Sequence, residues 1–66
     1  MRGIVAKIEA RMGWSIAKLG RTWWWVAVGH NGEVLASSQV YTTASKRDQT
    51  ALQVAAQLEV PFQIVK

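Results

Sequence analysis

The sequence feature that most constrains the fold is the pair Asn31-Gly32, which lies between two apolar runs at residues 22–30 and 33–41. A two-residue type I′ turn needs φ > 0 at both central positions, and Asn followed by Gly meets that requirement at low steric cost. The pair therefore predicts a β-hairpin. In the register that this turn sets, Ala27 faces Ala36 and Val28 faces Leu35.

The predicted hairpin has two largely apolar faces, whereas an antiparallel sheet with one face in water alternates apolar and polar residues. One face carries Trp23, Trp25, Ala27, Val34, Ala36, Ser38 and Val40. The other face carries Trp24, Val26, Val28, Leu35, Ser37 and Gln39. Both faces are therefore expected to be covered by something.

Residues 2–12 alternate between apolar and polar or charged side chains, with Val5 as the single exception, and this period of two predicts a strand. The apolar side comprises Ile4, Ala6, Ile8, Ala10 and Met12. A helix can also be drawn, because apolar residues recur every four positions to residue 16. Gly13 costs such a helix about 1 kcal/mol relative to Ala, so we favour the strand. Residues 14–21 either extend it past a bulge at Gly13 or form a connection that ends at Gly20.

Residues 44–58 are predicted to form an amphipathic helix that lies on a sheet. Its apolar arc comprises Ala44, Ala51, Leu52, Val54, Ala55 and Leu58, opposite Lys46, Gln49, Gln53 and Gln57. Thr42 or Thr43 supplies an N-cap hydroxyl, and Pro61 disfavours helix at Val60. Residues 62–65 then form a short last strand, with Pro61 tolerated at its start.

The size of the chain predicts a second subunit. A chain of 66 residues buries only roughly 60% of its unfolded surface, so its core needs a disulfide, a metal or a partner chain. The absence of cysteine excludes disulfides and thiolate sites, and one histidine makes a metal cluster implausible. We expect a homodimer.

The net charge of +4 is concentrated in the first 21 residues. These residues hold Arg2, Lys7, Arg11, Lys18 and Arg21 against Glu9. An anion-binding surface would therefore involve this third of the chain. Residues Arg11, Lys18, Arg21 and Trp24 are the candidates for nucleic-acid binding, in which cations pair phosphates and tryptophans stack on bases.

The sequence contains few residues from which a catalytic site could form. A nucleophile or a general acid and base must lie within hydrogen-bond reach of each other. His30 and Glu33, on either side of the predicted turn, are the one suggestive pair, and exposed loop tips ordinarily carry such residues. We predict no enzyme activity, no cofactor and no metal.

The run from Asn31 through Tyr41-Thr42-Thr43 and into a helix resembles the repeat of the YegP-like domains, small bacterial proteins of unknown function. The resemblance covers about residues 23–54 of a single domain at 1–66. It implies an α+β fold, a β3-α-β unit with an antiparallel sheet and one helix. Two such units share one sheet and exchange their last strands, which implies a dimer interface at Phe62, Ile64 and Val65.

This chain departs from the family at Thr50-Ala51, where the family usually has Gly-Ile. It departs further where the family places charged residues between the apolar hairpin positions. Here Trp24, Val26 and Val28 occupy those positions, so with Leu35 they are the predicted partner-binding strip. Self-association, or coverage by residues 14–19, is the alternative.

We therefore predict a non-enzymatic interaction module that binds a host or cellular protein, with nucleic-acid binding as the alternative. A short basic chain would also suit a phage-encoded accessory protein. No run of 18 apolar residues and no signal-peptide pattern is present, so we expect a cytoplasmic protein without membrane attachment.

Overall fold

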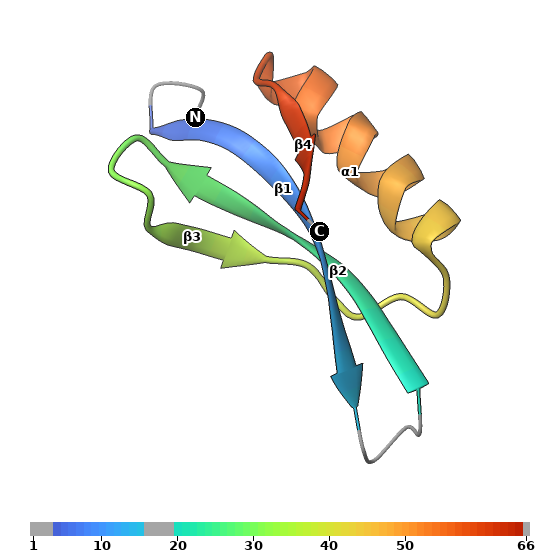
Figure 1. The fold of residues 1–66 in the computed structure, drawn as a ribbon. Coiled ribbons are helices and arrows are strands. Elements are labelled where there is room, and N and C mark those ends of the chain that lie inside the picture. The colour runs from blue at the N-terminus through green and yellow to red at the C-terminus, as the bar shows by residue number, and fades with distance from the viewer. Residues whose placement is uncertain (1–3, 16–19, 66) are drawn as a thin grey trace.

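The computed structural model describes residues 4–15 and 20–65. Its elements are β1 (Val5–Ser15), β2 (Gly20–Gly29), β3 (Val34–Ser37), α1 (Ala44–Leu58) and β4 (Phe62–Ile64). The four strands form one sheet in the order β3-β2-β1-β4, and α1 packs on one face of it (Figure 1). The predicted α+β class is confirmed.

The sheet is mixed, so the prediction of an antiparallel sheet is wrong for its last strand. β1 pairs antiparallel with β2, and β2 pairs antiparallel with β3, but β4 pairs parallel with β1 from Ile8↔Phe62 to Ala10↔Ile64. The cause is α1, which carries the chain back along the sheet to the level of Ile8. The strand that follows then runs in the direction of β1.

β1 confirms the strand that the period of two predicted. Ile8 and Ala10 are fully buried on the side of α1. The register with β2 shifts between Val5 and Lys7, and such a bulge adds one residue to one strand. The bulge turns Val5, the exception to the alternation, into the core. From Lys7 to the end of β1 the register is continuous, so the strand extends past Gly13 without a bulge there.

The turn between β2 and β3 has three residues, His30, Asn31 and Gly32, instead of two. The N–H of Gly32 donates to the carbonyl of Gly29 at 3.0 Å, and the N–H of Gly29 donates to the carbonyl of Glu33 at 2.8 Å. Within this fully described turn, only Gly32 has positive φ, at 86°. These features define a type I turn followed by a left-handed glycine, so the predicted type I′ turn is wrong. Asn31 instead accepts the N–H of Glu33 with its Oδ1 at 3.3 Å.

A second bulge compensates for the longer turn. Val28 pairs with Val34, and the register then shifts so that Ala27 pairs with Ala36. Leu35 is the extra residue. The predicted pair of Ala27 and Ala36 is confirmed, whereas the predicted pair of Val28 and Leu35 is wrong.

α1 has the predicted bounds, and its ends have the predicted chemistry. The hydroxyl of Thr43 accepts the N–H of Lys46 at 3.2 Å as the N-cap. At the other end, Glu59 is left-handed with φ of 58°, and the N–H of Val60 donates to the carbonyl of Ala55 at 3.0 Å, a Schellman-type stop before Pro61. No helix in the described residues is long and apolar enough to cross a membrane.

The core lies between α1 and the β1–β2 part of the sheet. Ala51 and Ala55 are the buried helix residues that pack against Ile8 and Ala27. Their small side chains let the helix approach the sheet closely. The partly buried residues around this centre are Trp25, Val54, Leu58, Val60 and Phe62.

Ile8→Ala tests this centre. The Ile8 side chain is 0% exposed, and removing it leaves a cavity, so we expect a loss of about 2–5 kcal/mol in the free energy of unfolding. Urea denaturation measures the loss. Leu52→Ala, at an exposed position of α1, is the control and should change the free energy by less than about 1 kcal/mol. Equal losses in the two variants would contradict this description of the core.

Candidate interaction surfaces

The predicted partner-binding strip is largely buried within the chain. Trp24, Val26 and Val28 do lie on the sheet face opposite α1, as predicted, because they alternate with the core residue Ala27. Val26 and Val28 are each only 2% exposed, however, and Trp24 is half-buried. Both valines are therefore covered within the chain, and of the predicted strip only Leu35 is exposed. Val26 lies between Glu9 of β1 and Ser37 of β3, whose side chains flank it on this face.

Trp24 lies across β1 at Gly13. Its ring atoms Cη2 and Cζ3 are 3.0 and 3.1 Å from the position that a Cβ of residue 13 would occupy. A side chain at Gly13 would displace the indole. The glycine that made a helix unfavourable in the sequence is thus the residue that lets a tryptophan of β2 cover β1.

On the face opposite α1, the part of the sheet formed by β1 and β4 carries charged side chains. Glu9 Oε2 lies 2.9 Å from Lys7 Nζ, and Glu9 Oε1 lies 2.9 Å from an Arg11 nitrogen. Lys7 also donates to Gln63 of β4 at 3.0 Å. Hydrogen bonds from Lys7 and then Arg11 lower the pKa of Glu9 below its ordinary value of 4.5.

Leu35 lies on the other side of the sheet from the rest of the predicted strip. Its Cδ1 is 3.4 Å from the position that a Cβ of Gly29 would occupy, on the α1 side of β2. The bulge in β3 causes this change, and Val34 takes the place beside Val28. All four residues of β3 are exposed. We call Val34, Leu35 and Val40, three exposed apolar residues at this edge, the β3 surface.

The β1–β2 hairpin extends beyond the N-terminus of α1, as Figure 1 shows. We call its distal part, residues 11–15 and 20–24, the arm. In the arm Met12 pairs with Trp23 and Trp14 pairs with Arg21. Trp14 is 68% exposed and Met12 is 43% exposed. The sequence suggested Trp14 only as part of a segment, residues 14–19, that could cover the strip, but Trp14 lies on the other face; no signal marked Met12 or Trp14 as exposed.

The residues predicted for nucleic-acid binding do not share one face. Arg11 and Trp24 pair with each other on the face opposite α1, and Arg11 is bound to Glu9. Arg21 is exposed and pairs with Trp14 on the α1 side. Lys18 lies outside the described residues.

The residues predicted for the dimer interface divide between core and surface. Phe62 packs against the core of its own chain, whereas Ile64 and Val65 are exposed at the sheet edge. The structure therefore leaves part of this set available to a second chain.

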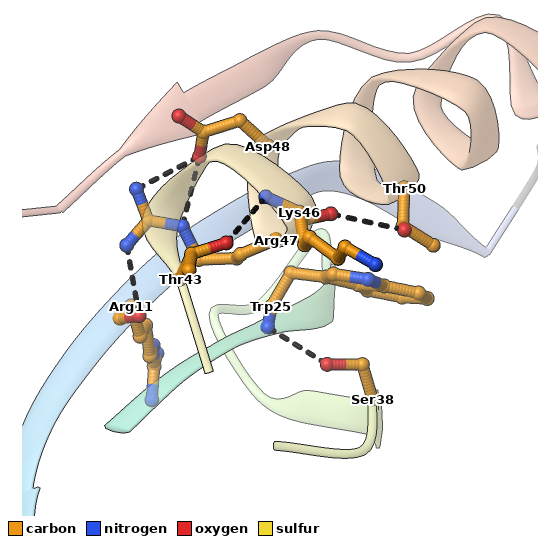
Figure 2. Close-up of polar contacts among 8 residues, drawn as sticks. All are labelled: Arg11, Trp25, Ser38, Thr43, Lys46, Arg47, Asp48 and Thr50. Carbon is orange, nitrogen blue, oxygen red and sulfur yellow. Dashed lines mark hydrogen bonds and ion pairs between the residues drawn. The ribbon is translucent and has the colours of Figure 1, made fainter. Parts of the chain in front are cut away.

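Arg47 ties the start of α1 to the base of the arm, a role that sequence analysis missed. Its guanidinium carbon lies 5.2 Å from the centroid of the Trp23 ring, a cation–π contact. The same group donates to the main-chain carbonyl of Arg11 at 3.0 Å and to Asp48 at 2.8 Å (Figure 2). Arg47 is only 4% exposed. Its position four residues before Ala51, on the buried side of α1, is the signal that could have found it.

No pocket is detected in the residues that the structure describes, and no group of three or more His, Asp or Glu side chains there could hold a metal. His30 and Glu33 are both exposed beside the β2–β3 turn. The described surface offers strand edges and apolar side chains for contacts with other molecules.

Comparison with known proteins adds no relative: no family model, curated protein or solved structure matches this chain. The resemblance to YegP-like domains stays a prediction. We therefore infer the function of the protein from the surfaces described above.

The lowered pKa of Glu9 predicts a pH dependence of stability. Because the carboxylate is favoured in the folded state, its stabilising contribution is present above pH 4.5, its ordinary pKa, and is lost as the pH falls through the lower folded pKa. Glu9→Gln removes the titrating group. We expect the difference in free energy of unfolding between wild type and Glu9→Gln to shrink from pH 7 to pH 3, as measured by urea denaturation. A difference independent of pH would contradict the assignment.

Proposed function

We propose that this protein is a non-enzymatic interaction module that acts as a homodimer and binds a protein partner through the β3 surface. The observation that carries the proposal is the exposure of Val34, Leu35 and Val40 along one sheet edge. Val34 and Leu35 lie on opposite faces of the sheet, so apolar side chains are exposed on both sides of this edge, which favours a binding surface there. We propose the β3 surface in place of the strip of Trp24, Val26 and Val28, because both valines are buried within the chain.

The local chemistry of the β3 surface favours protein over nucleic acid. Residues 33–45 contain no Lys or Arg, so this surface has no cations of its own with which to pair phosphates. The bulge at Leu35 also interrupts the regular ladder that a partner strand would extend. We therefore expect the partner to bind through side-chain contacts with Val34, Leu35 and Val40.

The homodimer is proposed because the core is small for an independent domain. Exchange of β4 between two copies is compatible with the contacts of this strand. Phe62 would keep its place beside Ile8, supplied by the other chain, and the connection from α1 to β4 is Glu59, Val60 and Pro61. Exposed Ile64 and Val65 lie at the same edge.

Leu35→Asp tests the binding surface, with Leu52→Asp as its matched control. The two leucines have similar exposure, 41% and 51%, so neither change should unfold the chain. Affinity capture from cell extract, followed by mass spectrometry, should recover a partner with wild type and Leu52→Asp and lose it with Leu35→Asp. Loss with both variants, or with neither, would contradict a partner site on the β3 surface.

A further inference from the structure

We infer that two copies of this chain pair edge to edge through the outer edge of β1 in the arm, in an antiparallel register centred on Gly13. The inference rests on the proposed homodimer and goes beyond it by naming the strand edge and the residues that meet there. It needs no exchange of β4, but the end of β4 must shift: the N–H of Val65 donates to the carbonyl of Ala10, so Val65 lies beside Arg11, where this register brings the partner's Ser15.

The main-chain groups of the arm point toward this edge. β4 hydrogen-bonds to the N–H of Ile8 and to the carbonyl of Ala10, each at 2.9 Å. Because main-chain groups alternate along a strand, those of Met12 and Trp14 point to the same edge, beyond the end of β4. Within residues 4–15 and 20–65, no hydrogen-bond partner meets Met12 or Trp14 there.

Among the described residues, the edges formed by β3 and β4 are protected, and the edge of β1 in the arm is not. Proteins protect exposed strand edges with bulges, prolines or charged side chains. β3 has its bulge at Leu35, and β4 is only three residues long and follows Pro61. The β1 edge in the arm instead presents Met12 and Trp14, both apolar and exposed.

The three residues 12–14 are complementary to a second copy of themselves. A two-fold axis requires that if residue i meets residue j, then j also meets i. With Gly13 opposite the partner's Gly13, Met12 lies opposite the partner's Trp14 on both sides of the axis. Both residues point their N–H and carbonyl outward, so each such pair can form two hydrogen bonds. Sulfur beside an aromatic ring is itself a favourable contact.

Trp24, which lies on the face of the sheet opposite α1, adds to this contact. The tip of the Trp24 ring reaches Gly13, so two such rings would meet near the two-fold axis. Two facing glycines leave room for them. The same glycine thus explains both the packing of Trp24 within one chain and the close approach of two chains.

The charges of the arm do not oppose this pairing. Arg11 is held by Glu9 at 2.9 Å. Arg21 lies on β2, one strand away from the edge. On the α1 side of the arm, Met12 pairs with Trp23, and Arg47 lies over the Trp23 ring. The apolar side chains at the edge are therefore connected to the rest of the fold.

This pairing would bury only a short ladder of main-chain hydrogen bonds and a few side chains. Its buried surface area would lie at the lower end of the range for specific interfaces. The dimer should therefore dissociate on dilution, and sedimentation velocity over a range of micromolar concentrations measures this. We expect wild type to approach twice its 7.3 kDa chain mass at high concentration. Trp14→Lys and Met12→Lys should raise the dissociation constant at least tenfold, because each places a cation at the symmetric edge.

Val40→Lys, at an exposed apolar position on the opposite edge, is the control and should dimerise as wild type. Circular dichroism establishes that each variant is folded. A wild type that stays monomeric at all concentrations would overturn this inference together with the homodimer. Dimers that persist in Trp14→Lys and Met12→Lys would overturn the β1 edge alone and leave the homodimer proposal standing. If the protein stays monomeric and binds an oligonucleotide through the arm, that result would also overturn the inference.

Discussion

The rest of the structure depends on the close contact of two helix alanines with the centre of the sheet. Ala51 and Ala55 pack against Ile8 and Ala27, which pair with each other across β1 and β2. Because apolar burial is the main favourable term in folding, this small contact determines where α1 lies. It also leaves the arm and β3 outside the cover of the helix, and these are the parts to which we assign binding.

Sequence alone predicted the elements with strong local signals and missed what depends on packing. The bounds of α1 follow from Thr43 and Pro61, and the strand character of β1 follows from its alternation. Neither bulge was foreseen, because a bulge reflects a balance between turn geometry and side-chain burial on two strands. The bulge in β3 moved Leu35 to the other face, so the prediction that Leu35 shares a face with Trp24, Val26 and Val28 was wrong.

The burial of Val26 was also out of reach of the sequence. Both faces of β2 are apolar in sequence, and only the fold shows that Glu9 and Ser37 flank Val26 on the face opposite α1. The exposed tryptophan is instead Trp14, in the segment of the sequence that was hardest to interpret. Its exposure depends on the length of the β1–β2 hairpin relative to α1, which no local pattern encodes.

The central claim is that the outer edge of β1 is where two copies meet, and amide hydrogen exchange by NMR tests it residue by residue. In the monomer the amides of Met12 and Trp14 have no partner among the described residues, whereas the amide of Gly13 faces β2. We expect exchange at Met12 and Trp14 to slow markedly as protein concentration rises, while exchange at Gly13 is slow throughout. Fast exchange at Met12 and Trp14 at every concentration would contradict it.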